Sequence, residues 1–207
     1  MNNVSFTSLF PNPLMEVQLD LDLEKLTEFA FEILNKDKKG VETNGGGWQS
    51  NDIREEKNKE FKKLKKEINH LLQIYYSEIF RGMEFREPTI QNLNNMWVTI
   101  NEKHQNIEWH LHGFSTLSGV YYIKHDGVES GDILFKHPVG SYMERSHWPV
   151  NLIKTHNEIT ASVINIMPKP NMLLIFPSWL DHKVETNLEN DSRISISFNS
   201  TLSSEKK

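Results

Sequence analysis

The spacing of apolar residues divides the chain into two parts with different periodicities. In the first part, apolar side chains recur every three to four residues in two stretches, which is the pattern of amphipathic helices. The first predicted helix begins after Asp22, which can cap it, and ends between Lys36 and Gly40. A second, longer helix is predicted from about Asn51. Its apolar stripe comprises Phe61, Leu64, Ile68, Leu71, Leu72, Tyr75 and Ile79.

Between the two predicted helices, residues 44–50 contain three consecutive glycines, which favours a loop. After about residue 94 the period changes from 3.6 to 2, which is the spacing of β-strands. Short strands are predicted at 96–101, 117–124, 132–137, 162–167, 172–177, 182–186 and 193–199. Many short strands separated by turn residues are typical of a sandwich, a barrel or a jelly roll.

Helices followed by strands indicate an α+β fold in which helices brace one face of a β core. The 207 residues fit one domain spanning 1–207, with a helical part at about 1–93 and a β core at about 94–200. Apolar residues make up 37% and charged residues 25% of the chain, a balance that supports a packed core.

Composition narrows the classes of function. The formal net charge of -5 predicts no nucleic-acid or anionic-membrane partner. The absence of cysteine excludes disulfides, thiolate nucleophiles and Cys-ligated metals. No stretch approaches the roughly 20 apolar residues of a membrane span, and the N-terminal stretch lacks the pattern of a secretory signal. We therefore expect a soluble, cytoplasmic protein.

Three histidines are candidate metal ligands. In an extended segment, His110 and His112 point to the same side, so both imidazoles can meet one ion. Neutral imidazole suits Fe, Zn, Cu and Ni alike. His182 follows the very apolar strand at 172–177 and opens another strand, where the mouth of a barrel would lie. It is the expected third ligand, and the alternative is a surface histidine in a turn.

The strand at 193–199 alternates apolar and polar residues. Its polar face could simply meet water, as in many antiparallel sheets. However, Arg193 carries the side chain best suited to bidentate recognition of a carboxylate, and Ser195 adds a hydroxyl on the same face. In the strand at 117–124, Ser118 and Tyr122 share a face, and Tyr122 could offer its phenol to an acidic ligand, whereas we interpret Tyr121 as a core residue.

These elements, taken in order, resemble the putative 2-oxoglutarate–Fe(II) oxygenase family of marine bacteria and their phages. The resemblance extends over most of the chain. The motifs that carry it are LFPNPL at 9–14, GGWQS at 46–50, the MW of the strand at 96–101, His110-x-His112, LSGVYY at 117–122, FPSWLxH at 176–182 and RISISFN at 193–199.

The resemblance implies a double-stranded β-helix, which is a jelly-roll barrel with Fe(II) at its open end. By position, His110 and His182 match the two invariant histidines of such enzymes. His112 falls where most of them place an acidic residue, although the H-x-H form is usual in this family. Glu108 or Asp181 could instead complete the site, or an open position could host a halide.

The resemblance also implies a pocket for 2-oxoglutarate. Arg193 and Ser195 match the residues that hold the far carboxylate of this cosubstrate, Tyr122 matches a tyrosine that some hydroxylases use there, and Ser118 matches a weaker contact. For the substrate side we select Asn199 and Trp179, together with the glycine loop around Trp48 as a possible lid.

The implied activity is hydroxylation of a C–H bond with O₂, with release of succinate and CO₂, and no catalytic side chain beyond the metal ligands. The substrate would be a small molecule or a peptide, and a phage-encoded enzyme would act in the host cytoplasm. Two alternatives stay open. One is a cupin-like three-His dioxygenase or isomerase, which would have no need for Arg193 as a carboxylate clamp. The other is a non-catalytic jelly-roll binding module or virion component with structural or zinc-binding histidines.

Overall fold

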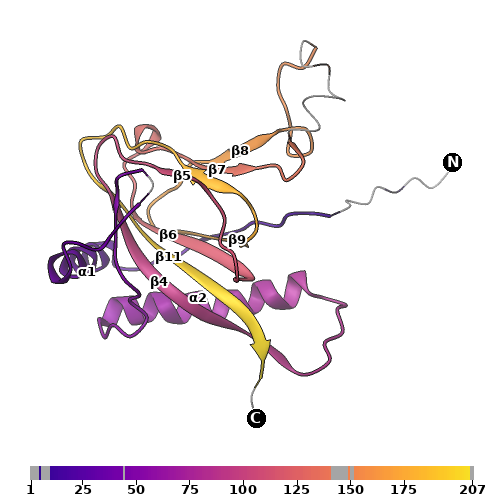
Figure 1. Cartoon of the computed structure of the whole chain (residues 1–207), viewed down its shortest axis with the longest axis horizontal. Helices are drawn as coiled ribbons and strands as arrows, with labels where there is room; N and C mark the ends of the chain where they lie inside the picture. Colours follow the sequence, from indigo (N-terminus) through magenta and orange to yellow (C-terminus); the bar gives the residue numbers. More distant parts are fainter. Residues whose placement is uncertain (1–4, 6–9, 44, 141–148, 150–151, 206–207) are drawn as a thin grey trace.

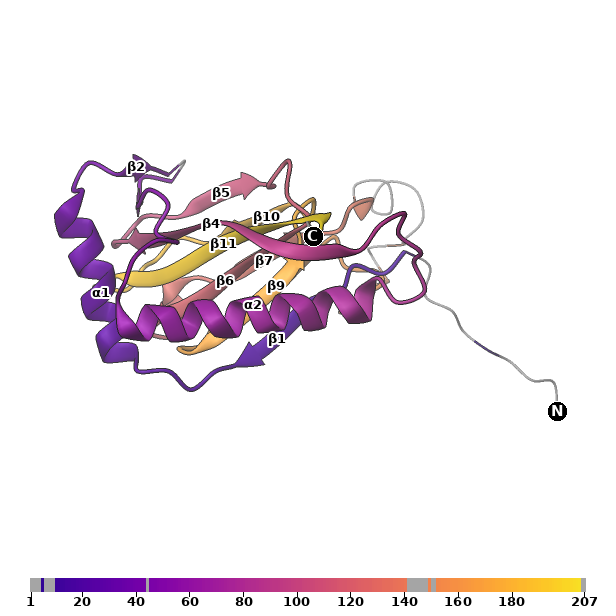
Figure 2. The same cartoon turned by 90° about the horizontal axis from the view of Figure 1, so that it is seen from below.

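A computed structural model describes residues 5, 10–43, 45–140, 149 and 152–205, and within these residues the chain forms two β-sheets and two α-helices (Figure 1). The two sheets lie face to face, and both helices lie beyond the outer face of the larger sheet (Figures 1 and 2). The α+β architecture predicted from the sequence is therefore present. Leu9, the first residue of the LFPNPL motif, lies outside the described residues.

The two sheets are antiparallel throughout, apart from isolated bridges. The larger sheet has the strand order β1 (Met15–Gln18), β9 (Met172–Pro177), β6 (Leu117–Lys124), β11 (Arg193–Ser204), β4 (Thr89–Asn101), β3 (Trp48–Gln49) and β2 (Val41–Glu42). The smaller sheet has the order β5 (Ile107–His110), β10 (His182–Val184), β7 (Ile133–Lys136) and β8 (Val163–Ile166).

Helix α1 (Leu23–Lys36) begins where the sequence predicts, because the Asp22 carboxylate accepts the Lys25 N–H at 3.2 Å. Helix α2 (Lys59–Ile79) begins later than the predicted Asn51, after an Asn58 cap. The reason lies in the preceding segment, which is bound to the edge of β4. Ser50 N–H donates to Val98 and Ile53 N–H donates to Met96, each at 2.9 Å, so these residues cannot join the helix.

The helices and the outer face of the larger sheet enclose the main hydrophobic core. From β11 this core receives Ile194, Ile196 and Phe198, all fully buried. The helices are joined to each other by the stacked rings of Phe29 and Phe61, with centroids 4.9 Å apart. Burial of each such side chain is worth about 1.5–3 kcal/mol, so this layer accounts for much of the stability of the fold.

A second, smaller apolar cluster lies between the two sheets. Strand β9, which pairs with β1 and β6 in the larger sheet, supplies both layers: Leu173 and Ile175 join the main core, whereas Leu174 and Phe176 face inward. Burial on both faces explains why 172–177 reads as a continuous apolar run rather than as an alternating one. The inward layer leaves room for a cavity at one end of the barrel.

All seven predicted strands are present, and the structure also corrects the prediction. The segment around the three glycines is not wholly loop, because β3 pairs with both β2 and β4. Strand β4 begins at Thr89, before the predicted residue 96. Strands β1, β2 and β5 were not predicted. Within the described residues, neither helix is both long enough and apolar enough to cross a membrane.

Candidate metal centre and adjoining cavity

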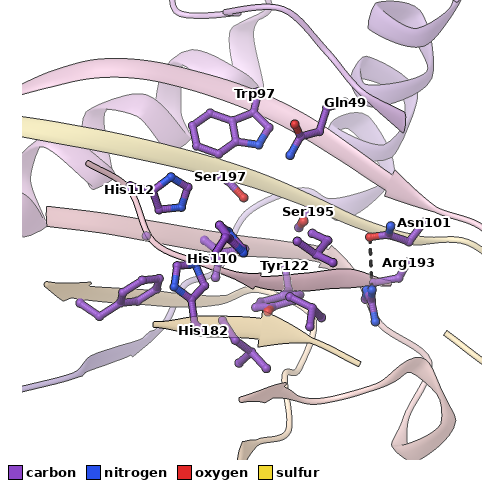
Figure 3. A pocket seen from close by; sticks show the side chains of 16 residues that line it. Gln49, Trp97, Asn101, His110, His112, Tyr122, His182, Arg193, Ser195 and Ser197 are labelled. Atoms are coloured by element: carbon purple, nitrogen blue, oxygen red, sulfur yellow. Dashed lines mark hydrogen bonds between the residues drawn. The ribbon is translucent and has the colours of Figure 1, made fainter. Parts of the chain in front are cut away.

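Three histidines meet at the open end of the barrel (Figure 3). His110 ends β5, His182 begins β10, and these two residues are direct partners across the sheet. His112 lies in the loop after β5. The potential ligand atoms of the three side chains all lie within 4.8 Å of one another. Among the residues that the structure describes, no other group of this kind contains three possible ligands.

A β-bulge in β5 aims His110 at this centre. His182 pairs with His110 and Val184 pairs with Ile107, so two steps along β10 correspond to three steps along β5. The extra residue places Ile107 and His110 on the same side, where both line the cavity. Glu108 is exposed and lines a separate surface pocket. Glu108 therefore does not share the inward side with His110, as simple alternation would require, because the bulge interrupts that alternation.

The backbone fixes which ring nitrogen faces the centre. His110 Nδ1 lies 2.8 Å from the Glu108 carbonyl oxygen, and His182 Nδ1 lies 2.8 Å from the Leu180 carbonyl oxygen. A carbonyl can only accept a hydrogen bond, so each Nδ1 carries the proton. Each Nε2 is therefore left with a free lone pair, which is the form that binds a metal.

The local environment keeps two of these imidazoles neutral. Burial, together with the charge of the neighbouring His110, lowers the pKa of His182 to about 3 and that of His112 to about 4. Metal ligation requires the deprotonated imidazole, so these side chains are ready to bind near neutral pH. The residues present thus fit a divalent transition metal such as Fe(II), by donor type, tautomer and mutual distance.

The loops that carry the histidines are tied together. His112 N–H donates to the Ser178 carbonyl at 2.9 Å, and Ser178 N–H donates to the Thr116 carbonyl at 3.1 Å. The ring of Phe176 packs edge-on against His182, with centroids 4.8 Å apart. Asp181, adjacent to His182, points elsewhere and pairs with Lys136 at 3.8 Å.

A cavity extends from the histidines to Arg193, with roughly 490 Å³ of empty space including its open mouth. Arg193 is only 2% exposed. Its guanidinium donates to the carbonyls of Ser130 and Glu185 and, at 3.2 Å, to Asn101 Oδ1. These bonds use three of its five N–H donors and leave two.

Arg193 has no ion-pair partner among the described residues. Burial lowers its pKa to about 10, so it still carries a charge at neutral pH. A buried cation without a counter-charge is costly, and an anionic ligand would relieve that cost. Tyr122 and Ser195 line the same cavity. The Tyr122 hydroxyl is buried without a partner, and burial raises its pKa, so the phenol keeps its proton.

The other selected residues lie in different places. Ser118 is buried and donates to Asn199 Oδ1 at 2.7 Å, away from the residues that line the cavity. Asn199 lines an outer cleft that adjoins the histidines. Trp179 is half exposed on the surface. Trp48 packs against the main core and donates to the Asp37 carbonyl at 3.2 Å.

Sequence reasoning missed several residues that line the cavity, among them Gln49, Trp97 and Asn101. Trp97 and Asn101 lie on β4 opposite Ser197 and Arg193 of β11, respectively. Pairing of the two alternating strands could have identified both residues, had the register been known. Gln49 comes from β3, which was expected to be loop.

The comparisons with solved structures establish the fold. The non-heme alpha-ketoglutarate-dependent epimerase SnoN from nogalamycin biosynthesis matches with a TM-score of 0.63 at 15% identity, over 92% of this chain and 78% of its own. A prolyl-4-hydroxylase from Pseudomonas putida matches with 0.60 at 12%, over 92% and 93%. The viral collagen prolyl hydroxylase from Paramecium bursaria Chlorella virus-1, in its 2-oxoglutarate complex, matches with 0.57 at 12%, over 90% and 94%.

The chain thus has the double-stranded β-helix fold that the sequence predicts. A search among curated proteins finds no significant match. The family model described as "Putative 2OG-Fe(II) oxygenase" matches residues 95–199, just over half of the chain and nearly all of the predicted β core. This chain therefore belongs to that family and is a 2-oxoglutarate-dependent Fe(II) oxygenase, using Fe(II), 2-oxoglutarate and O₂.

Proposed function

We propose that the enzyme hydroxylates a C–H bond of a substrate held beside the three histidines, with His110, His112 and His182 binding Fe(II) and Arg193 binding the far carboxylate of 2-oxoglutarate. The observation that carries this proposal is the buried, charged Arg193 in the lining of the same cavity as the histidine cluster. A dicarboxylate that spans the cavity would supply the missing counter-charge. A cupin-like enzyme without 2-oxoglutarate would leave Arg193 unpaired.

When bound, Fe(II) would supply the oxidation by O₂, coupled to conversion of 2-oxoglutarate to succinate and CO₂. The chain's own contribution is binding and orientation. The two free N–H groups of Arg193, together with the hydroxyls of Tyr122 and Ser195, would hold the carboxylate. The carbonyls of Ser130 and Glu185 and the Asn101 side chain keep the guanidinium in place.

Apolar side chains would exclude water from the reacting centre. The inward layer that lines the cavity beside the histidines comprises Val120, Ile133, Phe176 and Val184. A dry wall protects a reactive oxidant from side reactions. Three neutral imidazoles also leave the full metal charge uncompensated, which favours a dianionic cosubstrate over a neutral one.

The test is binding of 2-oxoglutarate to the anaerobic Fe(II) protein, followed by the visible charge-transfer band of the chelate. In the parent we expect the band to appear. In Arg193→Ala we expect about a 100-fold or larger loss of 2-oxoglutarate affinity with iron retained, because breaking a buried charge pair costs about 3–5 kcal/mol. The exposed Arg86→Ala is the matched control and should bind like the parent.

Two further variants keep the test decisive. Tyr122→Phe leaves the bonds of Arg193 intact and should weaken 2-oxoglutarate binding by about 10-fold, as expected for one hydrogen bond to a charged group. His112→Ala should lose the band. If Arg193→Ala binds 2-oxoglutarate like the parent, the assignment of Arg193 is wrong. If the iron-loaded parent shows no band, the cupin-like alternative becomes the better one.

The outcome of the oxidation needs its own experiment, because SnoN, which shares the fold, is an epimerase. Hydroxylation predicts a product that gains one oxygen atom from isotopically labelled O₂, detected by mass spectrometry. A product with no added oxygen would show that the enzyme catalyses another oxidation of the same class instead of hydroxylation.

A further inference from the structure

An outer cleft of roughly 450 Å³ adjoins the histidines, and Arg193 is not among its lining residues. The outer cleft and the inner cavity share five lining residues, namely Gln49, Trp97, Ile107, His110 and His112. A molecule in this cleft would therefore lie next to a metal on the histidines, and its size class is that of ordinary small-ligand sites.

Apart from the histidines, the only charged side chain that lines this cleft among the described residues is Asp52. Its carboxylate is already fully engaged. One oxygen accepts the N–H groups of Met96 and Arg54, each at 3.1 Å, and the other accepts the Arg54 side chain at 2.8 Å. The cleft therefore offers no free counter-charge to either an anion or a cation.

The cleft does offer unpaired hydrogen-bonding atoms. The Trp97 indole N–H and the Asn95 carboxamide oxygen are both buried without a partner. Two other polar groups in the lining are already paired: Ser50 Oγ accepts the Val98 N–H at 2.9 Å, and Thr43 Oγ1 accepts the Gly47 N–H at 2.8 Å. Buried polar atoms in native proteins are nearly always paired, so the two open positions mark where a ligand group completes the site.

The two atoms are placed by one strand. Asn95 and Trp97 are alternate residues of β4, opposite Asn199 and Ser197 of β11, so both side chains face inward. The Trp97 ring lies 5.8 Å from the ring of His112, between centroids. In Figure 3, Trp97 and Gln49 lie together on one side of the histidines, and Arg193 lies on another. A group bound to Trp97 would thus be near the metal.

We propose that the outer cleft selects an uncharged substrate through two hydrogen bonds, one accepted from Trp97 N–H and one donated to Asn95 Oδ1, with carboxamide-containing compounds as the fitting class. With the charge of the metal offset by the dianionic cosubstrate, an ammonium group would find no free carboxylate among the described lining residues. A carboxylate group would find no cationic side chain there. Describing the occupant as the substrate rests on the proposed function, whereas the chemistry of the cleft does not.

The test uses ¹⁵N-labelled protein loaded with Zn(II) and 2-oxoglutarate, so that no turnover occurs. The indole N–H resonance of Trp97 is identified by its loss in Trp97→Phe. Three probes of equal size are titrated: propionamide, propionate and propylammonium. We expect propionamide to shift the Trp97 resonance saturably, with at least 10-fold weaker responses to the two ions. Equal responses to all three probes, or no response to propionamide, would overturn the proposal. Bound water would then be the partner of Trp97 N–H and Asn95 Oδ1.

A charge-introducing variant tests the role of Asn95 directly. Asn95→Asp places a free carboxylate in the cleft and should reverse the preference by about 10-fold, toward propylammonium. Asn92→Asp, on the same strand but exposed and bonded to Ser203, is the matched control and should keep the preference for propionamide. If Asn95→Asp keeps the parent preference, Asn95 is not a determinant of selection.

The same samples separate this proposal from the proposed function. Binding of 2-oxoglutarate is followed independently by calorimetry. If propionamide shifts Trp97 but 2-oxoglutarate does not bind, the assignment of the cleft stands and the proposed function falls. If 2-oxoglutarate binds but propionamide leaves Trp97 unchanged, the proposed function stands and the cleft does not select amides.

Discussion

The two faces of strand β11 contrast within a single run of alternating residues. On the outer face, Ile194, Ile196 and Phe198 are fully buried against the helical layer. On the inner face, Arg193 and Ser195 line the cavity. The continuation of the inner face comprises Ser197 and Asn199. Because neighbouring residues of a strand point to opposite sides, one segment supports both the core and the site.

The faces also differ in how completely their groups are satisfied. Apolar contacts complete the outer face. On the same inner face of the sheet, the neighbouring strands β4 and β6 contribute Asn95, Trp97, Thr99 and Tyr122, whose side chains each contain a buried polar atom without a partner. An unsatisfied buried group costs about 1–3 kcal/mol. The comparison indicates that the outer face stabilises the fold, whereas the inner face has unpaired polar groups that can bind ligands.

The largest expected effect is a loss of stability in acid, because two histidines of the site are buried in the neutral form. The folded-state pKa values of His182 and His112, about 3 and about 4, lie below the ordinary value of 6.5. Between these values the unfolded chain binds more protons, so stability is complete above pH 6.5 and falls as the pH drops. Each histidine contributes at most about 1.4 kcal/mol per pH unit. Urea unfolding of the metal-free protein at pH 7 and pH 5 measures the loss.

The matched control for the acid experiment is His182→Asn, which removes one of the two titrating groups. Its free energy of unfolding should fall less steeply with pH than that of the parent. Equal pH dependence in the parent and the variant would show that neutral His182 is not the source of the acid sensitivity.

Truncating one side chain on each face of β11 should affect different quantities, namely the free energy of unfolding on the outer face and 2-oxoglutarate affinity on the inner face. Ile196→Ala should lower the free energy of unfolding by about 2–5 kcal/mol, because it leaves a cavity in the main core, with 2-oxoglutarate affinity unchanged. Ser195→Ala should change unfolding by no more than about 1 kcal/mol but weaken 2-oxoglutarate binding about 10-fold. Chemical unfolding and calorimetry measure the two quantities. A large loss of cosubstrate affinity in Ile196→Ala would contradict the separation of the faces.

The smallest effect is expected on metal affinity when the two carboxylates near the histidines are neutralised. Glu108→Gln and Asp181→Asn should leave metal affinity within about two-fold of the parent, because one side chain is exposed beyond the bulge and the other pairs with Lys136. Titration with Mn(II) or Zn(II) measures this affinity. A loss of about 10-fold or more, as is typical when a group that supports a ligand is removed, would bring a carboxylate into the site.

Much of the fold could be predicted from periodicity alone. Apolar residues at helical spacing located α1 and most of α2, and alternation or continuous apolar runs located the main strands. The start of α2 was wrong, because Ser50 and Ile53 pair with β4, which is a long-range contact without a local pattern. Strand β1 was missed because its four residues are too few to establish a period. The origin in marine bacteria and phages that the motifs suggest stays a prediction.

The site was predictable where residue type alone was decisive. The structure gathers His110, His112 and His182, and it places Arg193 in the adjoining cavity. Gln49, Trp97 and Asn101 were missed because their side chains are chemically ordinary and only the pairing of β4 with its neighbours brings them inward. Roles at Trp48 and Trp179 were inferred from residue type, and both side chains lie away from the described cavity lining.

The bulge in β5 has a consequence for protein engineering. A His-x-His pair copied into the matching strand of another barrel would reproduce the sequence motif but not the β-bulge that directs His110 inward. The transplantable unit is therefore the longer segment from Ile107 to His112, together with its partner strand β10. Removal of a single residue at 108 or 109 would rotate the histidine out to solvent while leaving the motif intact in the sequence. A search by motif alone would still classify such a protein as an oxygenase.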